Sequence, residues 1–173
     1  MRHGEKPAAG LGQLNCRGLN RSLALPNVLL KQFGKPVALF APNPGIEKKD
    51  GSGTYNYVRP LATIEPTAIR LGMPVDTRFS FEDIAGLKSA LLAPPFRDAV
   101  VFVAWEHREA ESLARDLMKT LGGDAASVPR WNSDNFDSLY VIRIDTAADG
   151  SRKSGFGQQY ERLNDQPDIC PGA

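Results

Sequence analysis

Two short apolar runs lie far apart in this chain, at Val37–Ala41 and Ala99–Trp105. Short uncharged runs that end at turn residues are typical of strands buried on both faces of a parallel sheet. Leu139–Ile144 predicts a final strand and Met73–Val75 a short edge strand. Helical patterns separate these runs. The alternation predicts an α/β fold with a mainly parallel sheet flanked by helices on both faces.

Four helices are expected, over residues 19–33, 60–71, 81–92 and 110–121. The last has the clearest apolar face, because its apolar residues recur at i, i+3, i+4 and i+7. We expect Pro26 to kink or restart the first helix and Gly34 to end it. Ser80 is the expected N-cap of the third helix, which places Glu82 and Asp83 in its first turn, where the helix dipole favours acids.

The composition fits one domain, because 173 residues with 42% hydrophobic content support a single core. We expect this domain over residues 1–145, with residues 146–173 as a tail or loose hairpin. The 21 basic and 20 acidic residues nearly cancel, so we expect neither a nucleic-acid nor a membrane-surface partner. No apolar run approaches the roughly 18 residues of a membrane helix, which predicts a soluble protein.

Cysteine and histidine are scarce. Cys16 and Cys170 are the only cysteines, and His3 and His107 the only histidines. These numbers and spacings do not predict a structural metal. The two cysteines either form a disulfide, which is typical of an oxidising compartment, or remain free thiols.

The two histidines are candidates for a shared site. Binding crevices of open α/β sheets lie outside the carboxyl ends of the strands, and His107 comes two residues after the predicted strand Ala99–Trp105. The segment after the strand at Val37–Ala41 leads to Arg59 through Ile46–Tyr57, which we interpret as a mobile, glycine-rich loop. His3 lies between Arg2 and Gly4. We expect the two imidazoles to meet around a phosphate.

The ordered set Arg2-His3-Gly4, Arg59 within Tyr57–Thr63, and His107 after a strand resembles the histidine phosphatase superfamily, which has the phosphoglycerate-mutase-like fold. Gly18–Leu25 and Thr63–Ala68 are also similar to that family, and the resemblance covers about residues 2 to 145. It implies a phosphatase that hydrolyses phosphomonoesters through a phosphohistidine intermediate, with no metal or other cofactor. The implied partner is a small phosphorylated substrate.

The resemblance also implies a role for each matching residue. Arg2 and Arg59 hold the phosphoryl group, because guanidinium groups match its oxygens with paired hydrogen bonds. His3 attacks phosphorus and His107 stabilises the oxygens as their charge shifts. Gly4 lets the backbone approach the phosphate.

A leaving alkoxide needs a proton donor, and four carboxyl groups are candidates. In the family this acid lies either after the second arginine or beside the second histidine. Glu82 is our first choice and Asp83 the next, although both also suit a helix terminus. Glu106 and Glu109 flank the second histidine, but Arg108 directly follows it, so the family's His-Asp variant does not match.

One departure from the family concerns the start of the chain. The Arg-His pair of the family follows a central strand, whereas only Met1 precedes Arg2 here. We therefore expect either a first central strand upstream of this sequence or a nucleophile on a fraying terminus. An upstream start leaves the compartment open, cytoplasmic or periplasmic.

Two other functions stay open from the sequence. One is a catalytically idle protein of the same fold that binds phosphate or a partner, and the other is a phosphoglycerate-type mutase. The loop Ile46–Tyr57 and the segment Arg130–Asp137 are expected to set the substrate, and the second could close over the site. Neither the substrate nor the oligomeric state follows from the sequence.

Overall fold

A central sheet of three parallel strands organises the protein, and the computed structural model describes residues 1–172. The strands run in the order β4-β1-β5, so β4 and β5 each pair with the central strand β1. The predicted α/β fold with a mainly parallel sheet is therefore confirmed. The strands are β1 (Ala38–Phe40), β4 (Val75–Asp76) and β5 (Val101–Val103).

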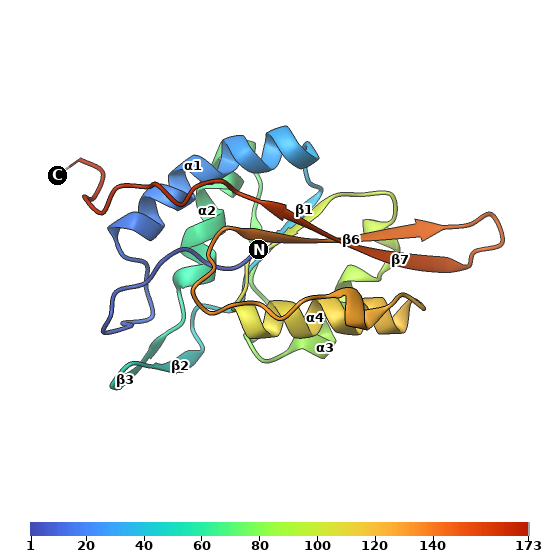
Figure 1. The fold of residues 1–173 in the computed structure, drawn as a ribbon, viewed down its shortest axis with the longest axis horizontal. Coiled ribbons are helices and arrows are strands. Elements are labelled where there is room, and N and C mark those ends of the chain that lie inside the picture. Colours follow the sequence, from blue (N-terminus) through green and yellow to red (C-terminus); the bar gives the residue numbers. More distant parts are fainter. Residues whose placement is uncertain (173) are drawn as a thin grey trace.

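Four α-helices cover the two faces of this sheet (Figure 1). Side chains of a strand alternate between faces. Leu39 accordingly lies in the core with α1 and α2, and Phe40 in the core with α3 and α4. The helices are α1 (Cys16–Phe33), α2 (Arg59–Leu71), α3 (Ile84–Leu91) and α4 (His107–Thr120), with two 3₁₀ turns, η1 (Pro94–Phe96) and η2 (Ala125–Ser127). None of these helices is long and apolar enough to cross a membrane.

Three local expectations about helices differ from the structure. Pro26 does not restart the helix, because α1 is continuous through it and ends at Gly34 with φ 77°. The N-cap of α3 is Asp83, not Ser80, and its carboxylate accepts a hydrogen bond of 2.9 Å from the amide of Gly86. Glu82 and Asp83 thus precede α3 instead of lying in its first turn.

The segment Ile46–Tyr57 is not the loop that we expected. It forms an antiparallel hairpin of β2 (Glu47–Asp50) and β3 (Gly53–Asn56). Asp50 and Tyr57 are buried, so the hairpin is anchored to the body of the protein.

The end of the chain forms a second, longer hairpin of β6 (Ser138–Thr146) and β7 (Arg152–Tyr160) (Figure 1). After β7 the chain runs back along α1, where Asn20 donates to the carbonyl oxygen of Ile169 at 2.8 Å. Cys16 and Cys170 form a disulfide there. The sequence left this pairing open.

The first three residues are held against the end of β5. The amide of Trp105 donates to the carbonyl of Met1, and the amide of His3 donates to the carbonyl of Trp105, each at 3.0 Å. The ammonium group of Met1 donates to the carbonyl of Val103 at 2.8 Å. Arg2 and Trp105 thus form a parallel bridge. The alternative of a fraying terminus was wrong.

A cavity of about 550 Å³ lies beside these residues, between β5 and β6. Met1 lines it together with both strands, Phe33 of α1 and Leu113 of α4. Because Met1–His3 runs parallel to β5, a strand in the same line upstream of Met1 would enter this cavity.

Candidate active site

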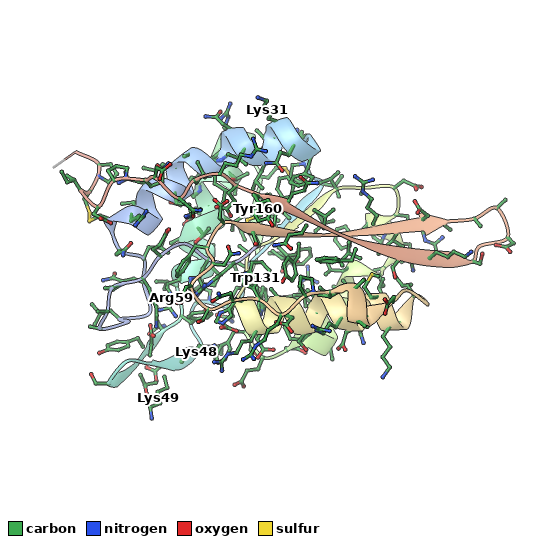
Figure 2. The ribbon with its side chains drawn as sticks, in the orientation of Figure 1. Lys31, Lys48, Lys49, Arg59, Trp131 and Tyr160 are labelled. Carbon is green, nitrogen blue, oxygen red and sulfur yellow. A yellow bond between two sulfur atoms is a disulfide. The ribbon has the colours of Figure 1, made fainter. Side chains whose placement is uncertain are left out.

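The structure brings together the four residues expected to bind and attack phosphate. Arg2, His3, Arg59 and His107 come from three separate segments, and each is at most 8% exposed. His3 is bonded to the end of β5, His107 is the first residue of α4, and Arg59 is the first residue of α2. Figure 2 shows Arg59 at the start of α2 beside the β2–β3 hairpin. All four therefore lie beyond the carboxyl ends of the parallel strands, as expected for an open α/β sheet.

The ring of His3 is held in one tautomer. Its Nδ1 lies 2.7 Å from the carbonyl oxygen of Gly4. A carbonyl only accepts hydrogen bonds, so Nδ1 carries the proton and Nε2 keeps a free lone pair. Burial and the nearby charge of Arg59 lower the pKa of His3 to about 3. The ring is consequently neutral at pH 7, with Nε2 able to act as a nucleophile.

Gly4 has a packing role. A Cβ at this position would lie 3.0 Å from the carbonyl oxygen of Gly18 in α1, so the loop approaches the helix closely. The amide of Gly4 donates to Oγ1 of Thr63 at 2.9 Å, and this hydroxyl donates to the carbonyl of Arg59 at 2.9 Å. The loop that carries His3 is thereby joined to the first turn of α2. A role of Gly4 at the phosphate stays a prediction.

Arg59 is oriented by Asp50, a residue that the sequence analysis missed. Its Nη1 bonds to the carboxylate of Asp50, which also accepts from Nζ of Lys6 at 2.6 Å and from the amide of Gly12 at 3.2 Å. Burial acts to raise the pKa of Asp50, but the bonds from Lys6 and Arg59 outweigh it and hold that pKa below its usual value. Asp50 is therefore ionised and fixes the guanidinium.

Arg2 is oriented by the segment that precedes β6. Its Nη1 donates to the carbonyl of Ser133 and, at 3.1 Å, to that of Asn135. The guanidinium carbon lies 3.6 Å from the centre of the Phe136 ring. Burial lowers the pKa of Arg2 to about 10, so the group remains charged at pH 7. Part of the segment Arg130–Asp137 thus contacts the site directly.

His107 is paired with Glu106. Its Nδ1 lies 2.7 Å from one carboxylate oxygen of Glu106, and the other oxygen accepts from the amides of Arg108 and Glu109 at 2.8 and 3.2 Å. Burial raises the pKa of Glu106, but His107 outweighs this effect and the pKa is lowered to about 2. Glu106 thus orients the imidazole and caps α4 as an anion, which makes it a poor proton donor.

The remaining acid candidates differ in their surroundings. The carboxylate of Asp83 is exposed and engaged in capping α3. Glu82 is exposed, and its charge acts on both Lys48 and Glu109. Burial, together with the charge of Glu106, raises the pKa of the half-buried Glu109. Glu109 is therefore the better prepared of these groups to carry a proton.

The hairpin supplies two further residues that the sequence analysis missed. The ammonium group of Lys48 lies 4.3 Å from the centre of the Phe81 ring and 5.0 Å from that of Tyr57. The centre of the Tyr57 ring also lies 4.9 Å from the guanidinium carbon of Arg59 and 6.0 Å from the centre of the His3 ring, in a T-shaped arrangement. Tyr57 could have been found from the sequence as an aromatic residue two positions before Arg59. It was missed because the glycines and charged residues around it indicated a loop.

Several buried donors in this site have no hydrogen-bond partner within residues 1–172, namely Nε of Arg2, Nε of Arg59 and the hydroxyl of Tyr57. Buried donors in folded proteins are normally satisfied, so free ones that converge point to a ligand that accepts hydrogen bonds. Two guanidinium groups beside a neutral imidazole suit a phosphoryl group. Within the same described residues, no cluster of three or more His, Cys, Asp or Glu side chains could hold a metal ion.

Comparison with known proteins supports the fold. No family model matches this sequence, and no curated protein matches it. A solved structure described as “Putative Phosphohistidine Phosphatase SixA” from Nakamurella multipartitia superposes with a TM-score of 0.56 at 14% sequence identity, covering 92% of each chain. The protein thus has the phosphoglycerate-mutase-like fold. At this identity the likeness concerns the fold alone.

Proposed function

We propose that this protein is a phosphatase of the histidine phosphatase superfamily that transfers the phosphoryl group of a phosphomonoester to His3 and then to water. The observation that carries the proposal is the state of His3, whose Nδ1 donates to Gly4 and whose low pKa keeps Nε2 unprotonated. The fold likeness and the two oriented arginines support the same chemistry.

In the proposed first step, Arg2 and Arg59 bind the phosphoryl oxygens through charge-assisted hydrogen bonds. Nε2 of His3 attacks phosphorus, the N–P bond forms, and the bond to the leaving oxygen breaks. His107 stabilises the oxygens as charge develops on them. In the second step water attacks the phosphohistidine, which releases inorganic phosphate and returns the lone pair to His3.

The leaving oxygen of a phosphomonoester takes up a proton in the first step. Glu82 was the first choice for this acid from the sequence. The raised pKa of Glu109 now makes it the stronger candidate, because a general acid must hold its proton near working pH. Replacing each by glutamine separates them, since the true acid should matter most for substrates with poor leaving groups.

A second candidate substrate is a phosphorus–nitrogen compound such as phosphohistidine, which the name of the structural neighbour specifies for that protein. The observation that favours it is that two of the candidate acids are engaged elsewhere. Glu106 is paired with His107 and Asp83 caps α3, so neither is available to protonate the leaving alkoxide of a phosphomonoester. Phosphoramidate, compared with an aryl phosphate, tests this candidate.

The experiment that tests the proposal measures phosphate release from both compounds in the presence of a chelator. The protein is compared with His3→Ala and His107→Ala, and with Arg143→Ala as a control in an exposed arginine of β6. We expect activity that is lost in His3→Ala and kept in the control, with an acid-labile phosphoenzyme in rapid-quench samples.

Other outcomes select the alternative functions. Phosphate or vanadate binding without turnover of either compound would contradict the phosphatase proposal and favour the idle, phosphate-binding protein. Isomerisation of a phosphorylated three-carbon acid would favour the mutase.

A further inference from the structure

A second pocket, of about 510 Å³, adjoins the candidate active site at His107. Residues 107, 108 and 111 of α4 form one side, and residues 130–133 form the other. Its volume lies within the range of small-molecule sites, which is about 300–1,000 Å³. The phosphatase chemistry proposed above leaves this pocket without a role.

The pocket and the phosphate site share their walls. His107 lines the pocket, and its buried Nδ1 lies 2.7 Å from a carboxylate oxygen of Glu106. Ser133 also lines the pocket, and its carbonyl oxygen accepts a hydrogen bond from Arg2. Arg2, His3 and Arg59 are themselves at most 5% exposed. A phosphoryl group held by them and by His107 therefore has the pocket as a space for the organic part of its substrate.

The pocket is positively charged. Arg108 and Arg130 line it, both are exposed, and neither has an ion-pair partner among the residues that the structure describes. The acidic residue of the pocket, Glu111, is neutralised by other contacts. One oxygen accepts from Nε of Arg115 at 3.1 Å and the other from the amide of Trp131 at 2.7 Å. Two arginines therefore line the pocket without an ion-pair partner in residues 1–172, while its carboxylate is engaged elsewhere.

We propose that this pocket binds a second anionic group of the substrate, a carboxylate or phosphate carried by the leaving group, through Arg108 and Arg130. Guanidinium groups recognise both anions with paired hydrogen bonds. The substrate class is then a small organic phosphate with a further acidic group. This inference rests on the proposed function in one respect: it assumes that the phosphoryl group of the substrate binds at Arg2, His3 and Arg59.

The test compares phenyl phosphate with 4-carboxyphenyl phosphate, which differ in one negative charge. We expect a higher kcat/KM for the carboxylated compound. In the double variant Arg108→Ala/Arg130→Ala, that kcat/KM should fall about tenfold, with phenyl phosphate unchanged. Arg143→Ala removes another exposed arginine, outside this pocket, and should alter neither value. An equal effect on both compounds, or none on either, would overturn the inference.

Binding measurements separate this inference from the proposed function. Calorimetry with His3→Ala needs no turnover, and there the carboxylated compound should bind about tenfold more tightly, an advantage that the two arginine substitutions remove. If neither compound is hydrolysed by the unmodified protein but this advantage is measured, the phosphatase proposal fails and the pocket inference stands. Selective binding of an acidic phosphopeptide, with no preference between the two small compounds, would contradict a small-molecule substrate.

Discussion

The carboxylate of Asp50 bonds to the guanidinium of Arg59, and it does so while fully engaged by two other donors, Lys6 and the amide of Gly12. Strand β2, which ends in Asp50, and the loop that follows His3 thus meet at one buried charge. The position of Arg59 depends on both segments. The expected phosphate-binding arginine is therefore fixed by residues that the family resemblance did not include.

Replacing Asp50 by alanine should lower kcat/KM about 100-fold, because a misplacement of about 1 Å of a binding group has effects of this size. Far-UV circular dichroism should change little if the effect is local. Asp76→Ala is a suitable control, since Asp76 pairs with the exposed Arg78. An Asp50 variant with unchanged kcat/KM would show that Arg59 needs no such support.

His3 should not become protonated between pH 7 and 5, so its titration should cause no loss of activity in this range. Its folded pKa of about 3 lies below the ordinary 6.5, so the ring stays neutral through this window. Its contribution to stability is present above pH 6.5 and is lost as the pH falls toward 3. NMR titration checks this, because the chain has two histidines and His3→Ala assigns their signals. A His3 midpoint between pH 6 and 7 would contradict it.

Arg21 shows where sequence patterns fail. It lies in the first helix that the sequence predicts, where nothing in the local pattern marks it for burial, yet its side chain is fully buried. It donates to Glu5 at 2.7 and 2.9 Å and to Glu161 at 2.7 Å, and so joins the first loop, α1 and the end of β7. Its partners are 16 and 140 residues away in the sequence. No local periodicity indicates such a contact.

Arg21→Met should reduce the free energy of unfolding by about 3–5 kcal/mol, because it leaves buried carboxylates without their partner. Urea denaturation measures this loss. Arg17→Met is the matched control on the same helix, since the Arg17 side chain is 38% exposed and should contribute less than about 1 kcal/mol. Equal losses in the two variants would exclude a special role for the buried network.

Much of the site was nevertheless predictable. The apolar run Ala99–Trp105 identified the strand that precedes His107. Because parallel strands place their carboxyl ends at one edge of the sheet, this placed His107 at the candidate site. The hairpin at Ile46–Tyr57 was missed because β2 and β3 lie largely outside the core, so no apolar alternation marks them. Lys48, Asp50 and Tyr57 were missed with it. Their roles depend on contacts with distant segments, which a single sequence does not reveal.

Removing the disulfide should destabilise the protein. Cys16 and Cys170 are 154 residues apart, and a crosslink closing a loop of this length restricts the unfolded chain strongly. Cys16→Ser/Cys170→Ser should lower the free energy of unfolding by about 2–4 kcal/mol. The same denaturation curve for the reduced, unmodified protein is the control. Identical midpoints with and without reductant would contradict this prediction.

The cavity between β5 and β6 leads to a last prediction. Extending the chain upstream of Met1 by about five alternating apolar residues should raise the melting temperature by several degrees. Such a strand could continue the pairing of Met1 along the edge of β5 and bury apolar surface against Phe33 and Leu113. Thermal melting checks this, with an equally long Gly/Ser extension as the control. Equal melting temperatures for both extensions would contradict it.

An extension could raise the melting temperature in two ways, by pairing as a strand or by removing the charge of the Met1 ammonium. The pH dependence of the rise distinguishes these two effects. Burial lowers the pKa of the Met1 ammonium to about 6 from its ordinary 8.0. The folded state thus resists protonation, and stability is lost as the pH falls from 8 toward 6. Any extension turns this ammonium into an amide, which can still donate to Val103. The Gly/Ser extension should therefore help only below pH 8, and increasingly so toward pH 6, whereas the apolar strand should also stabilise the protein at pH 8.5.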